Sequence, residues 1–326
     1  MYYLKIVRPL NLLMIAITML LFRVCIIAAS PYKIFYVQPE LSNVSYVFLM
    51  LSTLFIAAGG YVINDIFDAE IDAINRQHTV IVKKHISENV AYNYYKILCL
   101  LGVIFTFLLA FFSHNFRLSM LPLIIMVILN FYAHSFKKQF FIGNFMIAIS
   151  AAFVIILPML FEAVSSDADN DMQTEIKTGI IIAGIVYGLF AFLSTLLREI
   201  VKDMEDINGD EQLGCRTIPV VLGVKKTKYI ATVIAFILLI QLSVFAYFFP
   251  SIQIKNVSLV IILGLILPLI AIVVSLFFAK TASNYHNVSN LIKVFMFLGI
   301  ASMLYFIGGT GPYIFMQFIN FVQKYI

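Results

Sequence analysis

Residues 43–72 read NVSYVFLMLSTLFIAAGGYVINDIFDAEID, an apolar run that ends in a group of carboxylates. The apolar part, 43–63, reaches the length of about 20 residues that a helix needs to cross a bilayer. After it, Asp65, Asp68 and Asp72 stand at positions i, i+3 and i+7. At about 100° per residue, these positions fall within about 60° of the helix circumference. The stretch therefore predicts a membrane-spanning helix whose end carries a face of carboxylates.

The same pattern occurs a second time in residues 202–210, which read KDMEDINGD and follow the apolar run 179–197. Asp203, Asp206 and Asp210 repeat the spacing i, i+3 and i+7. Three carboxylates on one helix face repel one another unless a cation lies between them. Hard oxygen ligands of this kind suit Mg²⁺, which commonly bridges a protein carboxylate and a substrate phosphate. Two such faces at a membrane surface indicate a metal-bound diphosphate.

The composition indicates the class of protein. The chain of 326 residues is 62% hydrophobic and 12% charged, whereas soluble domains are roughly 45–50% apolar and about 25% charged. The excess forms long apolar runs, which are typical of a polytopic membrane protein. We therefore predict a single all-α domain, residues 1–326, with about nine transmembrane helices. The predicted spans are 10–29, 43–63, 97–112, 118–134, 141–162, 179–197, 229–249, 257–279 and 294–320.

Basic residues between the spans orient the chain. With the N-terminus in the cytoplasm, 16 Lys and Arg residues fall on the inner side and 5 on the outer side, while Arg23 lies inside the first span. The positive-inside rule therefore predicts an N-in, C-out topology with an odd number of spans. Both aspartate segments then lie at the cytoplasmic mouth, in a bacterial-type inner membrane. These loops account for the net charge of +5, so the charge gives no indication of nucleic-acid binding.

Two inner connections, about 64–96 and about 198–228, are predicted to be long, and each begins with an aspartate segment. Basic residues follow both segments. A diphosphate bound to Mg²⁺ still exposes oxygens, and Lys or Arg side chains neutralise them as the leaving group departs. On the outer side, the acidic segment from Glu162 to Lys177 is expected to be a solvated connector.

The two aspartate segments resemble the two signatures of the UbiA superfamily of intramembrane prenyltransferases. The first is Asn64-Asp65-x-x-Asp68-x-x-x-Asp72, and the second is Arg198-Glu199-x-x-Lys202-Asp203-x-x-Asp206-x-x-Gly209-Asp210. Shorter similarities lie at Arg8-Pro9-Leu10-Asn11, at Asn130-Phe131-Tyr132 through Lys137 to Gly143-Asn144, and at Gly214-Cys215-Arg216-Thr217-Ile218-Pro219-Val220. The similarity covers essentially the whole chain.

The resemblance implies a ring of nine helices around a central cavity, with both aspartate segments at its cytoplasmic mouth. It implies Mg²⁺-assisted ionisation of an isoprenyl diphosphate to an allylic cation, which a membrane-associated acceptor captures. The implied ligands of two Mg²⁺ ions are Asn64, Asp65, Asp68, Asp72, Asp203, Asp206 and Asp210, of which Asp65, Asp68, Asp203 and Asp206 are taken as catalytic. The implied diphosphate-binding residues are Arg76, Lys137, Arg198 and Lys202, and the residues implied near the reacting carbon are Asn11 and Tyr132.

One segment departs from the family pattern. Residues 75–87 read NRQHTVIVKKHIS, without the Pro and Gly residues that many relatives have after the first signature. This loop is expected to cover the site. Its path through residues 75–96, and with it the contacts to the acceptor, stays open.

The acceptor is open between several classes of molecule. The form Lys-Asp-x-x-Asp-x-x-Gly-Asp followed by Arg-Thr-Ile-Pro is most similar to members that add a second geranylgeranyl chain to geranylgeranylglyceryl phosphate. The alternative is an aromatic acceptor, a quinone precursor such as 4-hydroxybenzoate or dihydroxynaphthoate. The alternative outside enzymes is a secondary transporter. Transporters place their carboxylates near the membrane midplane, whereas here the carboxylates cluster at the helix ends.

Overall fold

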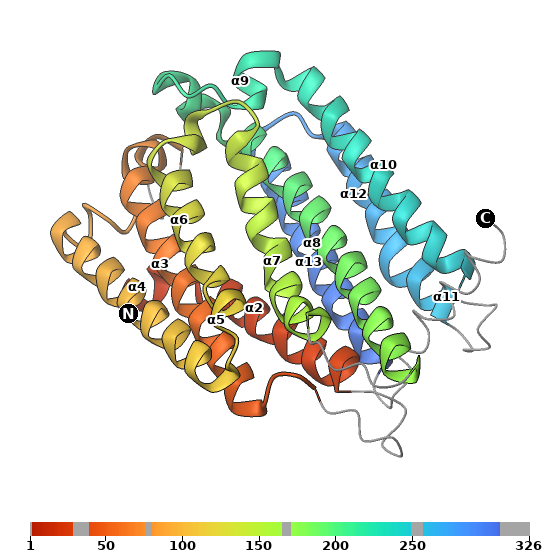
Figure 1. Ribbon diagram of the computed structural model, residues 1–326. Helices are drawn as coiled ribbons and strands as arrows, with labels where there is room; N and C mark the ends of the chain where they lie inside the picture. The colour runs from red at the N-terminus through yellow and green to blue at the C-terminus, as the bar shows by residue number, and fades with distance from the viewer. Residues whose placement is uncertain (1, 29–38, 76–79, 165–170, 249–256, 307–326) are drawn as a thin grey trace.

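The structure, a computed structural model, describes residues 2–28, 39–75, 80–164, 171–248 and 257–306. Helices that lie side by side make up almost all of this part of the chain (Figure 1). They are α1 (Tyr2–Ile6), α2 (Pro9–Leu21), η1 (Phe22–Ile27), α3 (Asn43–Asn75), α4 (Glu88–Ser113), α5 (Phe116–Ser119), α6 (Leu121–His134), η2 (Phe136–Lys138), α7 (Ile142–Ala163), α8 (Asp171–Gln212), α9 (Ile218–Leu222), α10 (Val224–Phe248), α11 (Val257–Ile261), η4 (Ile262–Ile266), α12 (Leu267–Phe278), α13 (Ala282–Ala301) and η5 (Ser302–Phe306). No strand forms within these ranges beyond an isolated bridge between Val82 and Ile86. The all-helical class is confirmed.

The helices match the predicted spans closely. Among the described residues, eight helical segments have the length and composition to cross a membrane, and Ile262–Phe278 forms a shorter apolar helix where a ninth span was predicted. The last span is displaced, because its helix begins at Ala282 rather than at residue 294. The polar stretch before residue 294 therefore belongs to the helix and not to a loop. Residues 307–320 of that predicted span lie outside the described part.

Both aspartate segments are helical to their ends. Helix α3 continues to Asn75 and α8 to Gln212, so the long inner connections begin later than predicted. The side of each helix that faces away from the carboxylates is apolar, and Ile66 and Met204 are buried there against the bundle. An amphipathic pattern of this kind continues the helix beyond the apolar run. The 42 residues of α8 span about 63 Å, roughly twice the hydrocarbon thickness of a bilayer.

The packing of the helices brings the two aspartate segments to the same end of the bundle. Helix α3 packs on α4 and α6, α7 packs on α8, and α8 packs on α13 and α10. Helix α2 joins the two groups because it contacts both α3 and α7. In Figure 1 the aspartate-bearing ends of α3 and α8 lie at the top, where α9 also lies.

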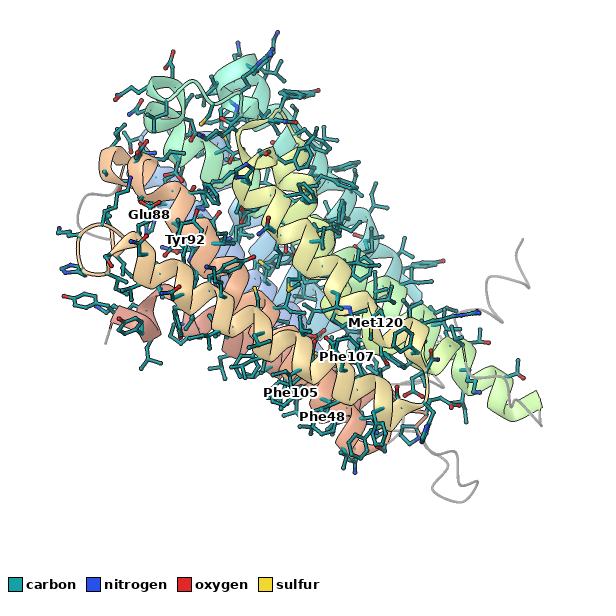
Figure 2. The ribbon with its side chains drawn as sticks, turned by 60° about the vertical axis from the view of Figure 1, so that its left-hand side comes forward. Phe48, Glu88, Tyr92, Phe105, Phe107 and Met120 are labelled. Atoms are coloured by element: carbon teal, nitrogen blue, oxygen red, sulfur yellow. The ribbon has the colours of Figure 1, made fainter. Side chains whose placement is uncertain are left out.

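The outer surface of α4 is apolar. Figure 2 shows Phe105 and Phe107 along this helix and Phe48 of α3 beside them, whereas Glu88 and Tyr92 mark the other end of α4. The ring centroids of Phe48 and Phe105 lie 6.2 Å apart, and Phe107 is 52% exposed. Large apolar side chains exposed along a long helix are what a surface in contact with acyl chains requires.

At the end opposite the aspartates, a charged pair is buried between helices. In η1, the Nη1 of Arg23 lies 3.5 Å from Oε1 of Glu162, which is near the end of α7. The Nη2 of Arg23 donates to the carbonyl of Leu41 at 2.5 Å, and its guanidinium lies over the ring of Tyr46. Arg23 is 7% exposed and Glu162 is 4% exposed. The prediction that Glu162 opens a solvated connector is wrong, because this carboxylate is the counter-ion of an arginine inside the bundle.

Candidate active site

A cavity of about 250 Å³ lies between α2, α3, α6, α7, α8 and α13. Its charged lining residues, Arg8, Arg198, Glu199, Lys202 and Lys293, gather toward the aspartate end. Further along the helices, the lining is apolar and includes Met14, Ile15, Phe153, Phe190, Met296 and Met303. Within the described residues, α4, α10 and α12 contribute no side chain to this lining. The prediction was a ring of nine helices around the cavity; the structure places six helices around it and these three outside them.

The first aspartate face is in direct contact with cations. The Nζ of Lys137, on η2 after α6, forms an ion pair with Oδ2 of Asp68. The side-chain amide of Asn64 donates to the same oxygen at 2.7 Å, and Lys137 also donates to Oδ1 of Asn64 at 3.4 Å. Nearly one turn earlier in α3, Asp65 Oδ1 lies 2.6 Å from Nη2 of Arg8. Two side-chain cations thus relieve the repulsion that the spacing of the carboxylates predicts.

Both cations are held in their charged state. Burial alone would lower the pKa of Lys137, but the negative charge of Asp68 outweighs burial and the pKa lies above the ordinary value for lysine. Burial likewise opposes the charge of Arg8, and Asp65 more than restores it, so the pKa of Arg8 is raised. Arg8 reaches Asp65 from a left-handed backbone conformation with φ of 52°, which a residue with a side chain rarely adopts. Arg8 is therefore a site residue that the sequence indicated only through a short similarity.

Two carboxylates of the second aspartate face accept from neutral hydrogen-bond donors. The side-chain amide of Asn144, in the first turn of α7, donates to Oδ2 of Asp203 at 2.9 Å. The hydroxyl of Thr217, just before α9, donates to Oδ2 of Asp210 at 3.1 Å. These donors orient the two carboxylates without supplying positive charge. Asp203 and Asp210 thus accept from neutral groups, whereas Asp65 and Asp68 are paired with cations.

Asn75 joins the two faces at the end of α3. Its Nδ2 donates to the backbone carbonyl of Asp206 at 3.0 Å, and its Oδ1 accepts from the amide of Gly209 at 2.9 Å. A Cβ at position 209 would lie 2.4 Å from Nδ2 of Asn75, so the close approach depends on glycine. The ends of α3 and α8 are thereby held in direct contact.

Three of the four residues predicted to bind the diphosphate lie around this mouth. Lys137 contacts the first face, and Arg198 and Lys202 line the cavity from α8. The Nη1 of Arg198 lies 2.6 Å from Oε1 of Glu199, while its buried Nε has no acceptor among the described residues. A buried guanidinium N–H without an acceptor is a position where an anionic ligand gains a hydrogen bond. Arg76 lies outside the described residues.

The two residues predicted near the reacting carbon, Asn11 and Tyr132, both line the cavity. The aspartates lie beside the mouth of the cavity and are not among its lining residues. From the first aspartate segment, Asn64 lines the cavity. Asp72 and Asp206 lie further along the same helices and take part in contacts of their own.

The aspartates do not yet form a closed set of metal ligands. In the part of the chain that the structure describes, no three carboxylate, imidazole or thiol groups lie close enough together to hold a metal ion. At the first face, Lys137 and Arg8 lie against the oxygens that a metal would use. The oxygen-only donor set of carboxylates and an amide nevertheless suits Mg²⁺. Binding a metal at Oδ2 of Asp68 would therefore require the ammonium of Lys137 to move away.

Two charged residues of the cavity were not predicted as site residues. Glu199 was part of the quoted motif but had no role assigned to it, and the structure buries it at 8% exposure beside Arg198. Lys293 was assigned to an inner loop, because the apolar run begins only at residue 294. The structure places Lys293 within α13, on the cavity wall.

Comparison with known proteins agrees with this geometry. The model of the UbiA prenyltransferase family matches residues 24–300. A digeranylgeranylglyceryl phosphate synthase of Methanosphaera stadtmanae is 30% identical over 304 residues, which cover 92% of this chain and 97% of the relative. The protein of the same name from Methanothermobacter thermautotrophicus is 31% identical over 314 residues, with 95% of this chain and 96% of the relative covered.

Solved structures share the fold. A structure from a study of digeranylgeranylglyceryl phosphate synthase in membranes has a TM-score of 0.62 at 24% identity, covering 94% of this chain and 98% of that chain. A UbiA homolog from Archaeoglobus fulgidus, bound to GPP and Mg²⁺, has a TM-score of 0.56 at 18% identity, covering 93% and 100%. At these identities the likeness establishes the fold alone. Because the family model spans most of the chain, this protein belongs to the UbiA prenyltransferase family and is an integral membrane enzyme that transfers prenyl groups.

Proposed function

We propose that the enzyme transfers an isoprenyl group from a prenyl diphosphate to geranylgeranylglyceryl phosphate, with two Mg²⁺ ions bound at the aspartate faces. The main support is the junction that Asn75 makes between two carboxylate-bearing helix ends, beside a cavity that is cationic at its mouth and apolar further in. A donor with an anionic head and an isoprenoid tail matches both parts of this cavity. The prenyl diphosphate would lie with its head at the junction.

The proposed metal ligands are those that the sequence indicated. They are Asn64, Asp65, Asp68 and Asp72 for one ion and Asp203, Asp206 and Asp210 for the other. Mg²⁺ bound there would neutralise charge on the leaving diphosphate and so favour cleavage of the bond between its oxygen and the allylic carbon. Asn144 and Thr217 already orient Asp203 and Asp210 for this role.

Basic side chains complete the diphosphate site. Lys137 neutralises Asp68 in the metal-free protein, and once it leaves that carboxylate its ammonium is free to bind diphosphate oxygens. Arg198 offers its buried Nε, and Lys202 lines the same wall. Arg76 is proposed for the same role from the sequence. Together these cations stabilise the negative charge that develops on the leaving group.

The acceptor step takes place in the cavity. A hydroxyl oxygen of the acceptor forms the new bond to the allylic carbon, the bond from that carbon to the diphosphate oxygen breaks, and the hydroxyl proton passes to the released diphosphate. Tyr132 and Asn11 line this region, and an aromatic face stabilises a neighbouring cation. The apolar wall beyond them excludes water, which would otherwise capture the cation.

The glyceryl-phosphate acceptor is supported by the relatives. Two proteins named digeranylgeranylglyceryl phosphate synthase align over more than nine-tenths of this chain. These relatives give no comparable support to an aromatic acceptor. Membership in a prenyltransferase family argues against the alternative of a secondary transporter.

We also place the aspartate mouth on the cytoplasmic side of a bacterial-type inner membrane, on the strength of the distribution of Lys and Arg. Single cysteines introduced at Lys226 and Arg117, both exposed and at opposite ends of the bundle, test this orientation. An impermeant maleimide should label Arg117→Cys in intact cells and Lys226→Cys only after lysis. The reverse pattern would contradict the orientation.

A product assay tests the reaction. Purified protein in detergent receives Mg²⁺ and radiolabelled geranylgeranyl diphosphate, with geranylgeranylglyceryl phosphate, 4-hydroxybenzoate or dihydroxynaphthoate offered in parallel. We expect a prenylated glyceryl ether that disappears when EDTA is added. Product with an aromatic acceptor alone would overturn the proposed acceptor, and absence of Mg²⁺-dependent donor binding would overturn the site.

A further inference from the structure

Lys293 is a basic residue within a membrane-spanning helix, where a charged side chain is expected to have an anionic partner. It lies about three turns after the start of α13 and lines the central cavity. Ionisable residues at membrane depth are energetically costly and are found where they face a partner or a polar cavity. The structure gives Lys293 the cavity but, within the described residues, no ion pair.

The charges around Lys293 are mostly of its own sign. The cations Arg198, Lys202 and Arg8 share its cavity wall. The nearby carboxylate of Glu205 lies 3.0 Å from Nδ1 of His286. The cavity wall carries four cationic side chains, of which Arg198 is paired with Glu199 and Arg8 with Asp65 beside the mouth, so Lys202 and Lys293 supply the excess of positive charge. An apolar cavity with this excess of positive charge is built to receive negative charge.

Lys293 lies apart from the cation that contacts the first aspartate face. Lys137, which contacts the first aspartate face, is acted on by Asp68 and Asp72. Lys293 lines the cavity, whereas Lys137 and the aspartates of both faces are not among its lining residues. Lys137 and Lys293 therefore belong to two sides of the mouth: η2 supplies the cation near the metal ligands, and α13 supplies one away from them.

The wall next to Lys293 suits the chain of a lipid. Met296, Gly299 and Ile300 follow at i+3, i+6 and i+7 on α13, and all three line the same cavity. Their spacing places them on the same side of the helix as Lys293. This face of α13 thus offers a cation for a head group and, directly below it, an apolar stripe for a hydrocarbon chain.

We propose that Lys293 binds the phosphate monoester of the acceptor, and that the stripe below it holds the acceptor's ether-linked chain. The proposal rests on the glyceryl-phosphate acceptor proposed above. Lys293 is then the residue by which the enzyme distinguishes a phosphorylated lipid from its neutral counterpart.

The test compares two acceptors in wild-type and variant enzymes. Geranylgeranylglyceryl phosphate and its dephosphorylated form, geranylgeranylglycerol, are offered at saturating donor, and kcat/KM is measured for each. Wild-type enzyme should prefer the phosphorylated lipid by about 10- to 100-fold, as expected for one charge-assisted contact. Lys293→Met should reduce this preference to a few-fold and leave the KM for the donor unchanged, whereas Lys293→Arg should keep most of it.

Lys280→Met is the matched control, because Lys280 is an exposed lysine just before α13 and its loss should leave the preference intact. Thermal protection by the phosphorylated lipid alone gives a readout without turnover, and Lys293→Met should lose it. Lys293→Gln replaces Lys293→Met if the latter does not fold.

Retention of the wild-type preference by Lys293→Met would overturn the proposal, and so would a parallel rise in the donor KM, which would assign Lys293 to the diphosphate. A wild-type enzyme that uses neither lipid but prenylates an aromatic acceptor would overturn the proposed acceptor itself. The wild-type enzyme alone gives this last result, so it can be told apart from the two results that concern Lys293→Met.

Discussion

At the aspartate end of the bundle, Asp65 and Asp68 each meet a long cationic side chain that reaches in from another segment, whereas at the opposite end Arg23 and Glu162 are buried together. Asp68 is as well buried as Glu162, at 4% exposure each. Their partners differ, however, because the side chain of Lys137 is 21% exposed and that of Arg23 is 9% exposed. Lys137 therefore has a route to leave its carboxylate, and Arg23, which also bonds Leu41 and covers Tyr46, does not. We therefore expect the pair at the aspartate end to exchange and the pair at the opposite end to persist.

The strongest test of this contrast removes a carboxylate at the aspartate end. Asp68→Ala should lower turnover by at least about 100-fold, because losing a needed metal ligand costs several kcal/mol of transition-state stabilisation. Thermal unfolding should change little. Initial rates of product formation measure the effect, and Glu70→Gln is the control, since Glu70 is exposed on the same helix and pairs with Lys83. Asp65→Ala, Asp203→Ala and Asp206→Ala should behave as Asp68→Ala does. Retention of more than about a tenth of the activity by two of the four variants would contradict the two-metal site.

The opposite end should respond in stability rather than in turnover. Arg23→Met leaves the carboxylate of Glu162 buried without a counter-charge and should lower the free energy of unfolding by about 3–5 kcal/mol. The double variant Arg23→Met, Glu162→Leu should recover much of this loss, because neither charge then remains buried. Denaturant titration in mixed micelles measures both effects. Equal stability of the single and double variants would show that the pair is not a permanent one.

Lys137 should link metal binding to stability. In Lys137→Met the metal-free protein keeps Asp68 buried without its cation, so its melting temperature should fall by several degrees, on the order of 2–6 °C. Mg²⁺ should raise the melting temperature of Lys137→Met by more than it raises that of the wild-type protein, because in the variant the ion has no ammonium to displace. Thermal melts with and without Mg²⁺ give the difference. Lys138→Met is the matched control because Lys138 is the exposed neighbour, and an Mg²⁺ shift equal to that of wild type would contradict the exchange.

The junction between the two faces should give the smallest effect. Gly209→Ala displaces Asn75, and Asn75→Ala removes the same two hydrogen bonds, each worth about 0.5–1.5 kcal/mol. Each variant should reduce kcat/KM by about tenfold, and the double variant should be little worse than either alone, because both act on one contact. Steady-state kinetics with Asn208→Ala as the exposed control measures this. Fully additive losses would mean that Gly209 and Asn75 act independently.

Much of the fold follows from the sequence, because apolar runs of membrane length and the i, i+3, i+7 spacing of aspartates are local patterns. These patterns predicted one aspartate face on α3 and the other on α8, and in the structure the two helix ends are in contact. Lys293 escaped the same reasoning, since it ends the polar first half of α13, and only the cavity shows which way its side chain faces. Glu162 was misread for the converse reason: an acidic residue at the end of an apolar run usually meets water, and its burial depends on Arg23, 139 positions earlier in the chain.

The ion pair between Asp68 and Lys137 also sets an order of events in biosynthesis. Asp65 finds its partner Arg8 in chain that has already been made when α3 emerges, whereas Asp68 must wait for η2, beyond α4 and α6. Because an unpaired carboxylate within the bilayer costs several kcal/mol, the end of α3 remains at the water interface until that later segment arrives. The Asp68–Lys137 pair is thus complete only after four membrane-spanning helices have been made, and the reaction centre only after α8, the sixth among the described spans.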